Sequence, residues 1–217
     1  MATFLIVRHG EAEGNREHRF IGQADVPLSP IGRRQADAVS ARLAGMPVDR
    51  IISSDLQRAV DTVRPAASEL GLEIETDTRL REIDNGEWKG LLTTEIAQRW
   101  PALWARYSGG EDVARPHGET WADVRRRVVG ALREIAIASP KNSLIVVSAH
   151  GGPAMALTSW ACGLRPRGNL YQVPLVLPWN ASITTIRAPN LHLIAFNDVG
   201  HLPPDLQRPA DTGFLRS

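Results

Sequence analysis

Two histidines that lie far apart in the chain each follow a short apolar run and precede glycine. Arg8-His9-Gly10 comes just after the run Thr3–Val7. His150-Gly151-Gly152 comes just after a second run, Leu144–Ser148. If both runs are parallel β-strands, their carboxyl ends meet at one edge of the sheet, where open α/β sheets bind ligands. A neutral imidazole is a nucleophile near pH 7 and an adjacent arginine makes the place cationic, so the pattern predicts phosphate chemistry.

Transfer of a phosphoryl group to a side chain requires three kinds of group. A nucleophile must face the phosphorus, cations must hold the equatorial oxygens, and an acid must protonate the leaving alkoxide. His9 is the candidate nucleophile, because Gly10 lets the backbone approach an anion closely. His150 stands in the same setting, and the helix expected after it would offer free amides to an anion. The pairing of the two histidine motifs is stronger evidence than either motif alone.

A second cation and an acid complete the set of candidates. Arg58 is expected early in a helix that begins where a strand ends, so its side chain can point back to the site. Taken alone, an arginine at this position would more often be a solvated surface residue. The acid is expected within Leu80–Gly90, where Glu82, Asp84 and Glu87 compete. Spacing alone does not choose among these three carboxylates.

Alternating strand and helix patterns must position these residues. The apolar periodicity predicts strands at Thr3–Val7, Asp49–Ser54, Leu72–Glu75, Leu144–Ser148, Ser182–Arg187 and Leu191–Phe196. It predicts helices at Gln35–Gly45, Asp55–Leu70, Glu119–Ser139 and Pro153–Cys162. Pro65 is expected to bend or interrupt the second of these helices. The alternation predicts an α/β fold, a three-layer α/β/α sandwich whose sheet is mostly parallel with an antiparallel edge.

Residues 80–118 differ in composition from the rest of the chain. They are rich in tryptophan, glycine and charge, and contain one helical piece, Thr93–Tyr107, which Pro101 divides. We expect an insert that covers the active site of a single domain spanning residues 1–217. Its aromatic side chains are expected mainly to pack the insert against the core. One or two arginines near the mouth could bind a substrate carboxylate, and the candidates are Arg99, Arg106 and Arg115.

Composition limits the classes of partner. The 217 residues suit one large domain, and the net charge of +1 argues against nucleic-acid binding by bulk electrostatics. The apolar run Phe4–Val7 is too short for a signal segment or a membrane span. The single cysteine, Cys162, indicates a reducing compartment and is expected to pack rather than react. We therefore expect a cytoplasmic protein without nucleic-acid or membrane partners; its oligomeric state stays open, with a homodimer as one option.

Several short motifs occur in a fixed order along the chain. They are Arg8-His9-Gly10-Glu11, Asn15, Asp25, Leu28-Ser29, Gly32, Ser53-Ser54, Leu56, Arg58-Ala59, Leu80-Arg81-Glu82, Gly86, Trp88, Gly90, Gly118-Glu119, His150-Gly151, Asn180-Ala181-Ser182, Asn197-Asp198 and His201-Leu202. Each one is modest evidence, but the set in this order is highly specific. From Thr3 to about Leu202 the chain resembles the larger branch of the histidine phosphatase superfamily, which has the phosphoglycerate-mutase-like fold.

The resemblance implies a role for each candidate. It implies that His9 becomes phosphorylated, and it selects Glu82 as the proton donor. The phosphoryl group would be held by Arg8, Arg58 and His150. Secondary contacts in the pocket would come from Asn15, Gln23 and the amide of Gly151. Such enzymes need no metal or other cofactor, and the sequence contains no HExxH, CxxC or paired-aspartate spacing that would suggest a metal.

The resembling family contains both phosphatases and mutases. Its mutases are longer and have a larger insert after the acid, whereas Glu82–Trp88 and Pro116–Thr120 are closer to the phosphatases. We therefore predict a metal-independent phosphatase for a small phosphorylated metabolite, such as a phosphoglycerate, phosphoserine, a sugar phosphate or α-ribazole phosphate. The alternative is a cofactor-dependent phosphoglycerate mutase. A non-catalytic binding protein on the same fold is a weaker alternative, because all five expected catalytic residues are present.

Overall fold

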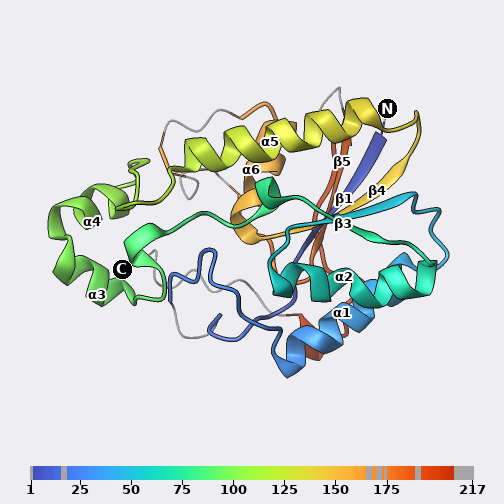
Figure 1. Cartoon of the computed structure of the whole chain (residues 1–217), viewed down its shortest axis with the longest axis horizontal. Helices are drawn as coiled ribbons and strands as arrows, with labels where there is room; N and C mark the ends of the chain where they lie inside the picture. Colours follow the sequence, from blue (N-terminus) through green and yellow to red (C-terminus); the bar gives the residue numbers. More distant parts are fainter. Residues whose placement is uncertain are drawn as a thin grey trace.

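A six-stranded mixed sheet forms the centre of the computed structural model, which describes residues 2–15, 19–164, 168–169, 173, 175–188 and 192–207 (Figure 1). The strands are β1 (Ala2–Arg8), β2 (Arg50–Ser53), β3 (Ile74–Thr76), β4 (Leu144–Ala149), β5 (Ile183–Ala188) and β6 (His192–Asp198). The helices are α1 (Pro30–Leu43), α2 (Gln57–Leu70), α3 (Thr93–Arg99), α4 (Pro101–Ser108), α5 (Trp121–Ala138) and α6 (Gly151–Ala161).

The order of the strands brings the two histidine motifs together. The sheet runs β3-β2-β4-β1-β5-β6, with β3, β2, β4 and β1 parallel and with β5 and β6 antiparallel to their neighbours. This confirms the predicted mostly parallel sheet with an antiparallel edge. Because Arg8 of β1 lies opposite Ala149 of β4, the next residues of the two strands, His9 and His150, leave the sheet side by side.

Helices cover both faces of the sheet, as the three-layer prediction requires (Figure 1). The alternation of side chains along β1 shows how the layers are held. Phe4 and Ile6 pack in the core shared with α5 and α6, whereas Leu5 and Val7 pack in the core shared with α1 and α2. Successive strand residues point to opposite faces, so a strand that is apolar throughout must be covered on both.

A third apolar cluster lies under α3 and α4, outside the two main cores. It contains Phe20, Trp88, Ile96, Tyr107 and Val113. The rings of Trp88 and Tyr107 meet edge to face, with centroids 5.3 Å apart. Pro101 begins α4 and so divides the helical piece as predicted, because it is pre-organised for a first helical turn and cannot continue the preceding helix. The aromatic residues of this region mainly pack with one another.

Two helices differ from the expected pattern. The helix α2 is not interrupted at Pro65, which lies inside Gln57–Leu70. The helix α1 begins at Pro30, five residues before the predicted start, with Ser29 as its N-cap. The side chain of Ser29 accepts a hydrogen bond from the amide of Gly32, and proline at the first helical position has no N–H that would need a partner. The apolar periodicity that set the predicted start does not extend into this polar first turn.

The expectation for Cys162 is wrong. This cysteine was expected to pack in an apolar helix, but α6 ends at Ala161 and the cysteine is exposed as its C-cap.

Two further findings concern membrane spans and the limits of the described residues. None of the helices in the described part of the chain has the length and apolar character that a bilayer crossing requires. The tail 208–217 and the link 189–191 between the last two strands lie outside the described residues.

Candidate active site

His9 is held as a neutral imidazole with one nitrogen available. Its Nδ1 lies 2.6 Å from the carbonyl oxygen of Gly10, so this nitrogen carries the proton and donates it. Its Nε2 accepts a hydrogen bond of 3.3 Å from Nε of Arg58. Burial, Arg58 and Arg8 together hold the pKa of His9 well below its usual range. An unprotonated Nε2 that faces a cation is the arrangement a nucleophile needs.

Arg58 is the cation that faces His9. It lies in the first turn of α2 and is 2% exposed. Its Nη1 and Nη2 donate to the carbonyls of Ala24 and Gly22 at 2.7 and 2.8 Å, which fixes the guanidinium. Burial lowers the pKa of Arg58 to about 10, so it remains a cation at neutral pH. The structure therefore places Arg58 in the site rather than on the surface.

His150 lies beside His9 behind the pocket wall. The two imidazole centroids are 5.1 Å apart, and Nε2 of His150 is 2.9 Å from Oγ of Ser54. His150 is fully buried, and its Nδ1 has no hydrogen-bond partner among the described residues. Burial, followed by the charge of Arg58, holds the pKa of His150 well below its usual range. It is thus a second neutral imidazole at the strand ends.

The two buried histidines make the fold sensitive to acid. Both are neutral in the folded protein, whereas in the unfolded chain they take up protons near pH 6.5. As the pH falls below 6.5, the unfolded state binds protons that the folded state does not, so the free energy of unfolding decreases. We expect a decrease approaching about 1.4 kcal/mol per pH unit for each histidine between pH 6.5 and 5. Urea unfolding at several pH values measures it.

Matched variants separate this effect from general acid sensitivity. His150→Asn should reduce the slope of unfolding free energy against pH by the share of one histidine. His192→Asn changes an exposed histidine of β6 and should leave the slope unchanged. An unfolding free energy that stays constant from pH 7 to 5 would contradict the neutral, buried state of both imidazoles.

The loop after β1 is fastened to both neighbouring helices. The amide of Gly10 donates to Thr62 of α2 at 2.9 Å, and the amide of Glu11 donates to Gln35 of α1 at 2.7 Å. A Cβ at Gly32 would lie 1.9 Å from the carbonyl oxygen of Glu11, so only glycine allows this close approach. The backbone around His9 is therefore set by α1 and α2.

Further polar residues surround His9. Arg8 donates to the carbonyl of Pro178. Asn180 donates to the carbonyl of His9 at 3.1 Å. Oδ1 of Asn15 accepts a hydrogen bond of 2.9 Å from the amide of Ala12, which fixes the side chain of Asn15 within the loop. All three line the same pocket as His9. Asn180 belongs to one of the motifs of the family resemblance, but the sequence did not identify it as a site residue.

Glu82 stands on the other side of the pocket and is fixed by backbone amides. Its Oε1 accepts the amide of Ile83 at 2.9 Å, and its Oε2 accepts the amide of Gly152 at 3.1 Å, at the start of α6. A Cβ at Gly152 would lie 2.3 Å from Oε1 of Glu82 and 2.6 Å from the ring of Trp121. Glycine at 152 therefore lets the carboxylate and the helix N-terminus meet.

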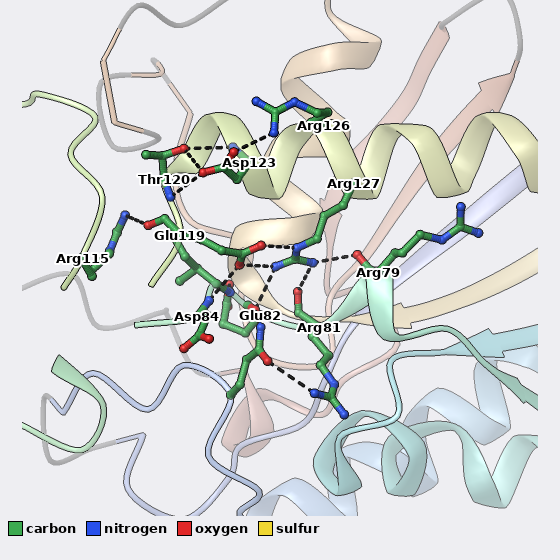
Figure 2. Close-up of polar contacts among 12 residues, drawn as sticks. Arg79, Arg81, Glu82, Asp84, Arg115, Glu119, Thr120, Asp123, Arg126 and Arg127 are labelled. Atoms are coloured by element: carbon green, nitrogen blue, oxygen red, sulfur yellow. Dashed lines mark hydrogen bonds and ion pairs between the residues drawn. The ribbon is translucent and has the colours of Figure 1, made fainter. Parts of the chain in front are cut away.

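An arginine of α5 fixes the backbone that carries Glu82 (Figure 2). Arg127 forms two hydrogen bonds with the carboxylate of Glu119, at 2.7 and 2.8 Å. The same guanidinium donates to the carbonyls of Arg79, Arg81 and Glu82 at 2.6 to 2.9 Å. Sequence reasoning did not find Arg127, because it lies on the polar face of a helix far along the chain. Only the folded structure shows that it positions Glu82.

The predicted contacts do not all reach the pocket. Arg8, His9, Asn15, Arg58, Glu82 and Gly151 line it. Gln23 is not among the described lining residues; its Nε2 instead donates to the carbonyl of Glu82 at 3.0 Å. His150 also lies behind the wall rather than on it. Gln23 therefore positions Glu82 in this structure, together with Arg127.

The three arginines that were expected as candidates for binding a substrate carboxylate also differ in whether they line the pocket. Arg106 forms an exposed ion pair with Glu111, at 2.6 Å, and Arg99 is exposed. Neither lines the pocket in the described structure. Arg115 does line it, together with Tyr107, Trp121 and Asn85. Residues from the stretch 80–118 thus form one wall, opposite the strand ends.

The sequence and the fold both match known proteins. The family model of the histidine phosphatase superfamily (branch 1) matches residues 4–192. A glucosyl-3-phosphoglycerate phosphatase of Mycolicibacterium vanbaalenii is 36% identical over 168 residues, which cover 74% of each chain. The phosphoglycerate mutase-like protein 4 of Arabidopsis thaliana is 33% identical over 223 residues, covering 100% of this chain and 90% of the relative. Several mycobacterial relatives are longer, and this chain covers 47% of their length.

The solved structures agree with the sequence matches. The structure of YhfR from Bacillus stearothermophilus superposes with a TM-score of 0.83 at 28% identity. The superposition covers 94% of this chain and 100% of the other. The three-layer architecture is therefore shared over nearly the whole length of both proteins.

Proposed function

Because the chain belongs to the histidine phosphatase superfamily (branch 1), we propose that it hydrolyses small phosphomonoesters through a phosphohistidine on His9. The observation that supports this most directly is the neutral, buried His9. Its free Nε2 lies 3.3 Å from the guanidinium of Arg58, and the carboxylate of Glu82 lines the same pocket. Nucleophile, phosphate-binding cation and proton donor thus share one small space.

The reaction follows two steps in which Glu82 changes role. In the first, Nε2 of His9 attacks the phosphorus, the bond to the ester oxygen breaks, and the leaving alkoxide takes a proton from Glu82. In the second, a water molecule gives a proton to Glu82 and attacks the phosphorus. The P–N bond breaks, its electron pair returns to Nε2, and inorganic phosphate leaves. Arg8 and Arg58 hold the phosphoryl oxygens in both steps.

The size of the pocket and the relatives support a small substrate. The pocket holds about 150 Å³, less than the roughly 300–1,000 Å³ of pockets that enclose drug-sized ligands. The mycobacterial relative is named for its action on glucosyl-3-phosphoglycerate, a phosphoester of a carboxylic acid. The plant relative carries the name of a mutase-like protein. A phosphoglycerate mutase is therefore the second candidate function.

Phosphate release from a panel of esters in EDTA tests the proposal. The panel contains 3-phosphoglycerate, phosphoserine, glycerol 3-phosphate and p-nitrophenyl phosphate. We expect release at an undiminished rate in EDTA, because protein side chains supply all the charges that the two steps need. Interconversion of 2- and 3-phosphoglycerate without release would instead establish the mutase. Release that stops in EDTA and returns with a divalent cation would contradict metal independence.

A further inference from the structure

Arg115 is a buried arginine that the proposed reaction does not use. It is 2% exposed, lines the same pocket as His9 and Glu82, and lies close to two aromatic rings. Its guanidinium carbon is 5.0 Å from the ring centre of Tyr107 and 5.1 Å from that of Trp121. Both distances lie within the range of cation–π contacts, so the two rings help to hold the guanidinium in place.

The hydrogen bonds of Arg115 use one part of the guanidinium. Nη1 donates to the carbonyl of Glu119 at 3.1 Å (Figure 2). It also donates to the carbonyl of Val113 at 3.4 Å. Nε and Nη2 are buried and have no partner among the described residues. No carboxylate of those residues lies within ion-pair distance of Arg115. A buried guanidinium without an anion is costly, so this one indicates a ligand that supplies one.

The unpaired edge has the shape of a carboxylate site. Nε and Nη2 form the side of the guanidinium that donates two parallel hydrogen bonds to the two oxygens of a carboxylate. A single guanidinium matches a single negative charge, and the burial of Arg115 beside two aromatic rings keeps water away from the pair. Nearby on the pocket wall, Oδ1 of Asn85 is also buried without a donor among the described residues. A hydroxyl or ammonium group on the same ligand can satisfy it.

From these contacts we propose that the Nε–Nη2 edge of Arg115 binds a carboxylate of the substrate while the strand ends hold its phosphoryl group. The preferred substrates are then phosphomonoesters of hydroxy acids or hydroxy amino acids. This inference rests on the proposed phosphatase function and adds the chemical class of the alcohol. Simple alkyl and sugar phosphates lack the carboxylate and leave the Arg115 edge unpaired, which is why they are poorer substrates.

Matched pairs of esters test the carboxylate directly. Glycerol 3-phosphate differs from 3-phosphoglycerate in having a CH₂OH group in place of the carboxylate, and phosphoethanolamine differs from phosphoserine by the missing carboxylate. For the wild type we expect kcat/KM about 100-fold higher for the carboxylated member of each pair, the effect of hydrogen bonds to a buried charge. In Arg115→Gln this ratio should collapse toward one, mainly through KM. Arg106→Gln, which changes an exposed arginine of the same region, should keep the wild-type ratio.

A binding measurement separates this proposal from the phosphatase proposal. In the His9→Ala protein, calorimetry should show tighter binding of 3-phosphoglycerate than of glycerol 3-phosphate, whether or not the wild type is a phosphatase. If the wild type releases no phosphate but this preference holds, the phosphatase proposal fails and the carboxylate site stands. If the wild type hydrolyses both members of each pair equally well, the carboxylate site is overturned and the phosphatase proposal stands.

Two further arms keep the test decisive. Arg115→Lys keeps the charge but has no side-on pair of donors, so it should also lose the preference; it replaces Arg115→Gln if that variant does not fold. A preference of the wild type for fructose 1,6-bisphosphate over fructose 6-phosphate, lost in Arg115→Lys, would assign the edge to a second phosphate. That result would overturn the carboxylate assignment.

Discussion

The His9→Ala protein is expected to lose nearly all phosphate release, with kcat reduced by about 10⁴- to 10⁶-fold, the range found when a covalent nucleophile is removed. In the proposed reaction, the imidazole supplies both the nucleophilic Nε2 and the group that carries the phosphoryl between the two steps. No described neighbour can replace it, because Nε2 of His150 is engaged with Ser54 and lies behind the pocket wall. Rapid quenching with ³²P-labelled 3-phosphoglycerate should trap an acid-labile label on the wild type and none on the variant.

The control for this result is a histidine outside the site. His192→Ala removes an exposed imidazole from β6 and should keep both the rate and the label. The melting temperature of His9→Ala should show that the variant is folded. A variant that is folded, releases phosphate at the wild-type rate and still takes up the label would place the nucleophile elsewhere.

The second large effect is expected in Glu82→Gln, and it should depend on the leaving group. Alkyl phosphates such as 3-phosphoglycerate should lose about 10³-fold in kcat, because their alkoxide needs a proton as it leaves. p-Nitrophenyl phosphate should lose far less in the first step, because nitrophenolate leaves without protonation. Steady-state rates with both esters, together with the burst of nitrophenol in the first turnover, measure the difference.

Glu87→Gln is the matched control for the proton donor. The sequence offered Glu87 as an alternative to Glu82, but Glu87 is not among the described residues that line the pocket. It is exposed, and its Oε1 lies 3.3 Å from Nε2 of the exposed His117. Its substitution should leave both rates unchanged. Equal losses for the two esters in the first turnover of Glu82→Gln would mean that Glu82 shapes the pocket without donating a proton to the leaving group.

The sequence predicted most reliably the site features that follow from where the parallel strands end. His9 and His150 meet because two parallel strands end in register, and this geometry follows from strand identity alone. The family resemblance, which the family match confirms, added Glu82, because spacing could not choose among three carboxylates. The early position of Arg58 in α2 was also predictable, but its burial and its bonds to the 22–24 loop were not.

What the sequence did not predict depends on contacts between distant segments. Arg127 sits on a polar helix face, and only packing shows that it holds the backbone of residues 79–82. Gln23 was expected to contact the substrate, but it donates a hydrogen bond to the Glu82 carbonyl. The sequence of a loop does not show which distant residues its side chains contact. Arg115 was one of three equivalent candidates until its burial in the pocket wall, near Tyr107 and Trp121, separated it from Arg99 and Arg106.

In the proposed reaction, the hydrogen bond between Nδ1 of His9 and the Gly10 carbonyl determines which ring nitrogen carries the phosphoryl group. With Nδ1 engaged at 2.6 Å, Nε2 is the nitrogen left to attack phosphorus, so the proposed adduct is the isomer phosphorylated on the nitrogen remote from the main chain. Phosphorylation of Nε2 while Nδ1 keeps its proton turns the ring into an imidazolium. The carbonyl then accepts from a charged donor, and such a bond is about twice as strong as the neutral one. In the proposed reaction, one backbone oxygen thus selects the isomer and stabilises the imidazolium form of the intermediate, which is the better leaving group when water attacks.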